Sequence, residues 1–347
     1  MKIFNIKLVT ALFAVVLMAG VCIFYACKKE EVIKNTITPQ VWKEKIEYMK
    51  IPCVDFSRIK KEVVSGTKST APMLVFESWE HYASVIDAML EFSYSYIEKR
   101  VQKVRDSIPG IDEDDLSLIL HNQGIYQFMP LYSFVKELQF TNSAFEKLRP
   151  EEIQWMQEPP TSDRDNPFDE MEMGYIQSAL HNSDGDVMIG NEIYNPKNDR
   201  TNGAKSCRQK DDIEIRTLNN NVWPTYNYNG KTRELRGFLS SKQDHSYAKT
   251  SVYYFCGNTR IVWLCNVEVR VEGKRLTDCD SNSPIRNSFD KSKKVFASVV
   301  EQYAWYIIGT YPNYLDPNYY ISNNKCYNSI VFGYYYAPGT TTWKIGL

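Results

Sequence analysis

The hydrophobic period changes once along this chain, and that change constrains the fold more than any other feature. Between residues 79 and 106 apolar side chains recur every three or four positions, which predicts a helix that begins after an N-cap at Ser78. Beyond residue 210 the period becomes two, most clearly from Val267 to Glu272, which indicates strands with one buried and one solvated face. We therefore predict an α+β fold: a helical N-terminal part followed by a mostly antiparallel β domain.

Composition and the period of the apolar residues divide the chain into four parts. We expect a lipoprotein signal peptide at 1–26, a polar tether at 27–45, a helix-rich α+β domain with a terminal hairpin at 46–200 and a β-rich aromatic domain at 205–347. The best hairpin turn is Asn229-Gly230. Residues 293–308 fit both a helix and a strand, and the spacing of their apolar side chains favours the helix.

The first 31 residues have the order of an export signal. Lys2 and Lys7 precede an uncharged stretch that ends at Ala26, and Cys27 and a charged segment follow. A cysteine directly after the cleavage site is the position that lipoproteins acylate, so we predict lipidation of Cys27 and attachment to a membrane through the N-terminal lipid. Two alternatives stay open: acylation at Cys22, and an uncleaved apolar anchor, because about 20 apolar residues can span a bilayer.

Three segments carry a resemblance to a known group of proteins. Residues 27–31, CKKEE, look like the acylated cysteine and acidic export tag of surface lipoproteins in Bacteroidota. Residues 73–90 and 183–194 resemble a strand–helix opening and a hairpin of uncharacterised lipoproteins of that phylum, with a domain of unknown function. The resemblance implies a lipid-anchored protein at the outer membrane or cell surface, or one facing the periplasm. It supplies no catalytic residues.

Six cysteines remain after the signal peptide and the acylated position, and an exported protein can pair them. If Glu272-Gly273 forms a two-residue turn, Cys265 lies one step from the position opposite Cys279, and a single bulge would align the two. We therefore predict a disulfide between Cys265 and Cys279.

The sequence contains few signs of catalysis. It has no nucleophile elbow, phosphate loop or dinucleotide fingerprint, so no cofactor is expected. Paired zinc-ligand spacing is missing, and residues 278–289 lack the glycine and final acid of a calcium loop, so no metal is expected either. With a net charge of −1 and no strongly basic half, nucleic acid is a poor partner. The acidic run from Asp112 to Asp115 fits a metal-binding face less well than a helix N-terminus.

Aromatic residues supply the only feature that resembles a site. The chain has 24 tyrosines, and Tyr334, Tyr336 and Trp343 are the candidate ligand-binding residues, with simple packing in the sheet as the alternative. We expect a non-catalytic surface lipoprotein, a binding or structural module for a glycan or protein ligand. The alternative is an extracellular hydrolase that uses paired carboxylates or a Cys–His pair, such as Cys256 with His245.

Overall fold

The computed structural model describes residues 44–63, 71–159, 164–196, 221–222, 225–241, 245–276, 285–305, 328–339 and 343–346. These residues all belong to one compact unit, Lys43–Leu347. Helices lie mainly in its first half and antiparallel strands in its second half, which confirms the predicted α+β class. The signal peptide, Cys27, almost all of the tether and the predicted boundary between the two domains lie outside the described residues.

The described N-terminal part is built mainly from helices. They are η1 (Phe56–Arg58), α2 (Trp79–Ser107), α3 (Glu113–Asn122), α4 (Pro130–Glu137), α5 (Ala144–Trp155), α6 (Pro167–Glu170) and α7 (Tyr175–Leu180). The predicted N-cap of α2 is confirmed, because the Ser78 hydroxyl accepts a hydrogen bond from the His81 backbone N–H at 3.3 Å. A small sheet adjoins these helices, with strand order β1 (Lys60–Glu62), β2 (Met73–Phe76), β3 (Val187–Ile189) and β4 (Glu192–Tyr194).

Two larger sheets follow, and all of their strand pairs are antiparallel. The middle sheet has the order β12 (Val299–Trp305), β8 (His245–Cys256), β7 (Lys231–Ser241) and β5 (Asn221–Val222), with β6 (Thr225–Tyr228) on β7 and β9 (Thr259–Val262) on β8. The outer sheet has the order β11 (Ile285–Ala297), β10 (Cys265–Leu276), β13 (Asn328–Tyr336) and β14 (Trp343–Gly346).

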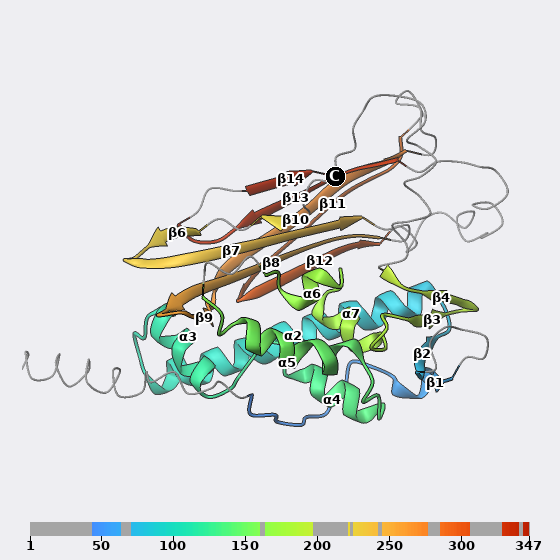
Figure 1. The fold of residues 1–347 in the computed structure, drawn as a ribbon, viewed down its shortest axis with the longest axis horizontal. Coiled ribbons are helices and arrows are strands. Elements are labelled where there is room, and N and C mark those ends of the chain that lie inside the picture. The colour runs from blue at the N-terminus through green and yellow to red at the C-terminus, as the bar shows by residue number, and fades with distance from the viewer. Residues whose placement is uncertain are drawn as a thin grey trace, which may run out of the picture. The chain divides into compact units, whose positions relative to one another are not determined.

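The compact unit is layered, with the middle sheet between the helices and the outer sheet (Figure 1). On the helix side, Trp155 of α5 packs edge-on against Tyr253 of β8 with ring centroids 5.6 Å apart. On the other side, β10 and β13 of the outer sheet contact β8 and β7. The middle strands are therefore buried on both faces: residues 247–254 of β8 are all buried.

Two structural predictions for the β-rich part are wrong. The segment 293–308 is not helical where it is described, since β11 ends at Ala297 and β12 begins at Val299. The predicted turn at Glu272-Gly273 is absent, because β10 continues to Leu276 and Gly273 pairs with Phe289 inside the ladder. In β12 five of the seven residues are buried and they do not alternate with exposed ones, so the two-residue pattern that identifies a half-solvated strand is missing.

Candidate functional site

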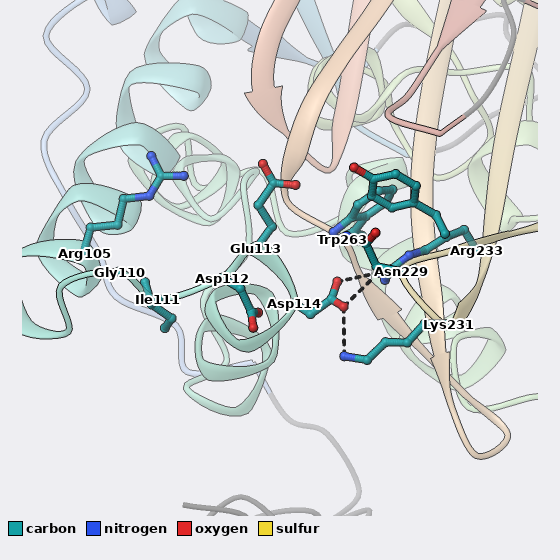
Figure 2. Close-up of a pocket in the computed structure, with 11 residues that line it drawn as sticks. Arg105, Gly110, Ile111, Asp112, Glu113, Asp114, Asn229, Lys231, Arg233 and Trp263 are labelled. Atoms are coloured by element: carbon teal, nitrogen blue, oxygen red, sulfur yellow. Dashed lines mark hydrogen bonds and ion pairs between the residues drawn. The ribbon is translucent and has the colours of Figure 1, made fainter. Parts of the chain in front are cut away.

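A polar cleft of about 870 Å³ opens where α2, α3 and the β6–β7 hairpin meet (Figure 2). Arg105 lies near the end of α2, and Asp112 to Asp114 come from the start of α3. Tyr228, Asn229 and Lys231 come from the hairpin. Segments more than 100 positions apart in the sequence therefore form this cleft.

The α3 side of the cleft is held by a helix cap. The carboxylate of Asp112 accepts a hydrogen bond from the Asp115 backbone N–H at 2.8 Å, and Glu113, Asp114 and Asp115 occupy the first turn. Acidic side chains there are stabilised by the partial positive charge of the helix N-terminus. The prediction that this acidic run begins a helix is confirmed.

The opposite side is set by the turn that the sequence predicts. Tyr228 pairs with Lys231, and the two residues between them have positive φ angles, 50° at Asn229 and 74° at Gly230. Asparagine and glycine are the residues that adopt this backbone conformation most readily. The tight turn brings the first residues of β7 beside the start of α3.

Asp114 joins the two sides through ion pairs. Its carboxylate oxygens lie 2.6 and 2.8 Å from Nη2 of Arg233, and Oδ2 lies 2.9 Å from Nζ of Lys231 (Figure 2). The Arg233 side chain is 1% exposed, whereas that of Lys231 is 41% exposed. The buried pair is the stronger contact, since water screens the exposed one.

Arg233 and Trp263 form the buried floor of the cleft. The guanidinium carbon of Arg233 lies 4.1 Å from the centre of the Trp263 ring, and Tyr228 packs on that ring at 5.6 Å. Among the described residues, Nε and Nη1 of Arg233 and Nε1 of Trp263 are buried without a hydrogen-bond partner. Buried polar atoms are normally paired, so these three donors have unused binding capacity.

The two central carboxyl groups of the cleft have opposite pKa shifts. Burial raises the pKa of Glu113 above its usual range. Burial also acts to raise the pKa of Asp114, but the hydrogen bonds from Arg233 and Lys231 outweigh it, and the pKa of Asp114 is lowered. Asp114 is therefore a firmly ionised partner of the two cations.

The predicted aromatic residues lie on the outer sheet, and its register divides them. Trp343 pairs with Tyr335, and Tyr334 pairs with Lys344, so the backbone places Trp343 on a different face from Tyr334 and Tyr336. Their role in ligand binding stays a prediction.

The turn after Tyr336 approaches the cleft. The Tyr226 hydroxyl donates to the Pro338 carbonyl at 3.3 Å, and a Cβ at Gly339 would collide with the Tyr228 ring. Gly339 also has a φ of 80°, which favours glycine. The turn after β13 therefore supports Tyr228 at the rim of the cleft.

The cysteine predictions lose their geometric basis. Cys265 is a buried free thiol opposite Ala297, and Cys279 lies outside the described residues. Cys256 and His245 occupy opposite ends of the 12-residue strand β8. At about 3.3 Å per residue they are roughly 36 Å apart, too far for a catalytic pair.

Two further findings concern only the described part of the chain. Within it, no group of three or more His, Cys, Asp or Glu side chains is placed to hold a metal ion. None of the helices described there has the length and apolarity required to cross a bilayer.

Fold and cleft define an α+β protein with layered sheets and a charge-balanced polar cleft. No protein-family model matches the chain, and no curated protein matches it. A solved structure that matches is a DUF4848 family protein from Bacteroides thetaiotaomicron, with 10% sequence identity, 83% of this chain and 100% of that chain covered, and a TM-score of 0.19. Because a TM-score of this size does not show a shared fold, the fold and function of this chain rest on its own residues.

Proposed function

We propose that this chain is a lipid-anchored protein of the outer membrane or cell surface that binds a ligand without catalysing a reaction. The sequence indicates the anchor, through Cys27 and the segment before it. The observation that carries the binding role is the cleft, where polar groups from α3 and the β6–β7 hairpin converge. A concave site with a few fixed polar groups is the usual form of a ligand site.

Two carboxylates of the cleft support a binding role over a catalytic one. Asp112 caps α3, and Asp114 is held between Arg233 and Lys231. Both groups have structural partners that fix their positions, which favours recognition because little ordering is needed when a ligand enters. Of the two ligand classes expected from the sequence, a glycan fits a cleft of about 870 Å³ better than a protein does, because protein interfaces are broader and flatter.

A glycan array tests this proposal directly. The mature protein, purified in detergent with its lipid, should bind selected glycans saturably and leave them chemically intact. Mass spectrometry of the recovered glycans checks the second point. Failure to bind any glycan on the array would overturn the proposal.

A hydrolase is a second candidate because two carboxyl groups, those of Glu113 and Asp114, line the same cleft. The pKa of Glu113 is raised and that of Asp114 is lowered, and such a split is typical of an acid and its partner in glycoside cleavage. If this candidate is correct, the protein releases reducing ends from a polysaccharide and Glu113→Gln abolishes the release. Intact glycans after prolonged incubation contradict it.

A further inference from the structure

We propose that the cleft between α3 and the β6–β7 hairpin binds a neutral oligosaccharide, whose hydroxyl groups pair with Arg233 and Trp263 at its floor. This inference rests on the proposed binding function and assigns it a site and a ligand chemistry. Three features of the cleft support it: the charge balance of the lining, the donors at the floor and the aromatic side chain at the rim.

The lining carries equal numbers of acidic and basic side chains. The acids are Asp112, Glu113 and Asp114, and the bases are Arg105, Lys231 and Arg233. A cleft for a phosphate, sulfate or uronate would have an excess of positive charge. Here an anion would meet three carboxyl groups, so the balance favours an uncharged polar ligand.

The floor of the cleft offers hydrogen-bond donors. The Arg233 atoms Nε and Nη1 and the Trp263 atom Nε1 can only donate, and they have no partner among the described residues. Both residues are almost completely buried, with whole-residue exposures of 0% for Arg233 and 1% for Trp263. A buried donor without a partner is unfavourable, and a ligand oxygen at this position would pair with it.

The walls offer acceptors to the same ligand. Asp112 is exposed and Glu113 is partly buried, and both line the cleft beside the donors. A hydroxyl group both donates and accepts, so neighbouring hydroxyls of a sugar ring can pair with a carboxylate and with an N–H group at once. An apolar ligand would leave both kinds of group unpaired, which is unfavourable.

Tyr228 completes the match at the rim. It is partly exposed, and its ring rests on Trp263, with Gly339 close behind it. A tyrosine held in this way presents an apolar ring and a wet hydroxyl at little cost in side-chain entropy. One face of a sugar ring is apolar, so it can pack on Tyr228 while its hydroxyls reach the floor.

The test uses the mature lipoprotein in detergent and affinity electrophoresis in gels that contain a polysaccharide. The neutral probes are starch, xyloglucan and galactomannan, and the charged probes are polygalacturonate and chondroitin sulfate. We expect retardation by a neutral probe, about tenfold weaker in Tyr228→Ala and several-fold weaker in Glu113→Gln. Tyr48→Ala is the matched control, because Tyr48 is 57% exposed and does not line the cleft. Thermal unfolding confirms that each variant is folded.

The outcomes distinguish a failure of the cleft proposal from a failure of the proposed binding function. Loss of binding in Tyr228→Ala with full binding in Tyr48→Ala supports the cleft. Full binding in folded Tyr228→Ala, with loss in Tyr336→Ala, would overturn the cleft proposal and leave the binding function in place. Retardation by the charged probes alone would overturn the proposed ligand chemistry. No retardation by any probe would count against the binding function itself.

Discussion

In the described part of the chain, Glu301 is a buried carboxyl group with hydrogen bonds to only one of its two oxygens. Its Oε1 accepts hydrogen bonds from the Tyr175 backbone N–H at 2.8 Å and the Tyr247 hydroxyl at 3.1 Å, while Oε2 is buried without a partner among the described residues. Burial raises the pKa of Glu301 to about 7, even though the nearby cation of Lys249 acts to lower it. The folded protein therefore holds a proton on this carboxyl group that an unfolded chain would release.

The raised pKa of Glu301 predicts that the free energy of unfolding falls as the pH rises. An unfolded glutamate titrates near 4.3, so between that value and about 7 the native state binds more protons than the unfolded state. Between pH 5 and pH 8 we expect this group to lower the free energy of unfolding by about 2–3 kcal/mol. Urea unfolding at both pH values measures it, and Glu301→Gln should lose that share of the pH dependence. An identical pH dependence in the variant would contradict the assignment.

Gly174 gives Glu301 and Tyr303 the space they occupy. A Cβ at this position would lie 2.9 and 3.0 Å from the two Glu301 carboxyl oxygens and even closer to the Tyr303 hydroxyl. Gly174 has φ of −73°, so the constraint is steric and does not come from the backbone conformation. We expect Gly174→Ala to lower the free energy of unfolding by about 1–3 kcal/mol, as measured by urea unfolding.

A second substitution makes the Gly174 prediction specific. The Tyr303 hydroxyl has no hydrogen-bond partner among the described residues, so Tyr303→Phe alone should be nearly neutral. Combined with Gly174→Ala it should restore part of the lost stability, because it removes the nearest atom. Strictly additive effects in this double-mutant cycle would show that the contact is not the cause.

At the scale of elements, one buried ion pair connects α3 to β7. Asp114 neutralises Arg233, which is 1% exposed, and removal of the acid leaves a buried cation without its partner. We expect Asp114→Ala to lower the free energy of unfolding by about 3 kcal/mol. Glu77→Ala is the control, because Glu77 pairs with Arg58 at the surface with side chains 57% and 50% exposed, and its loss should change the free energy of unfolding far less. If urea unfolding shows equal losses of stability in the two variants, the burial of the Asp114–Arg233 pair does not explain its contribution.

The elements also show what the sequence can predict. Helix α2 has both an apolar period and a cap at Ser78, and the Asn229-Gly230 turn has its own residue signature, so local chemistry is enough to locate them. Strand β12 has no such signal, because burial between two layers depends on residues far away in the chain. The continuation of β10 past Gly273 depends in the same way on pairing with β11 and β13.

The candidate site could be predicted only in pieces. The acidic run at 112–115 and the hairpin turn at 229–230 are both visible in the sequence. Nothing local indicates that they meet, and Arg233 and Trp263 look like ordinary strand residues until the fold buries them beside Asp114. The juxtaposition is a property of the tertiary structure, which is why the sequence directs attention to Tyr334, Tyr336 and Trp343 instead.

At the scale of the whole molecule, the proposed lipid anchor at Cys27 lies 17 positions before the first described residue of the compact unit. The first described residue, Glu44, is fixed by Arg149 of α5, with Oε1 2.6 Å from Nη2 in a pair whose side chains are 4% and 0% exposed. This contact fixes a residue of the proposed tether to the compact unit.

The proposed anchor makes a prediction about the mature N-terminus. Labelling with a palmitate analogue should mark the wild-type protein and the Cys22→Ser variant, and Cys27→Ser should be unlabelled. Mass spectrometry should find an acylated cysteine as the first residue. An unmodified thiol or an intact leader would contradict the proposal.

A crystal structure of the mature protein with a neutral oligosaccharide that it binds would test the proposed cleft site most directly. We predict sugar density on the Tyr228 ring, with hydroxyl oxygens within hydrogen-bond distance of Arg233 or Trp263 Nε1. Density on the outer sheet at Tyr334 or Tyr336, with the cleft empty, would contradict it.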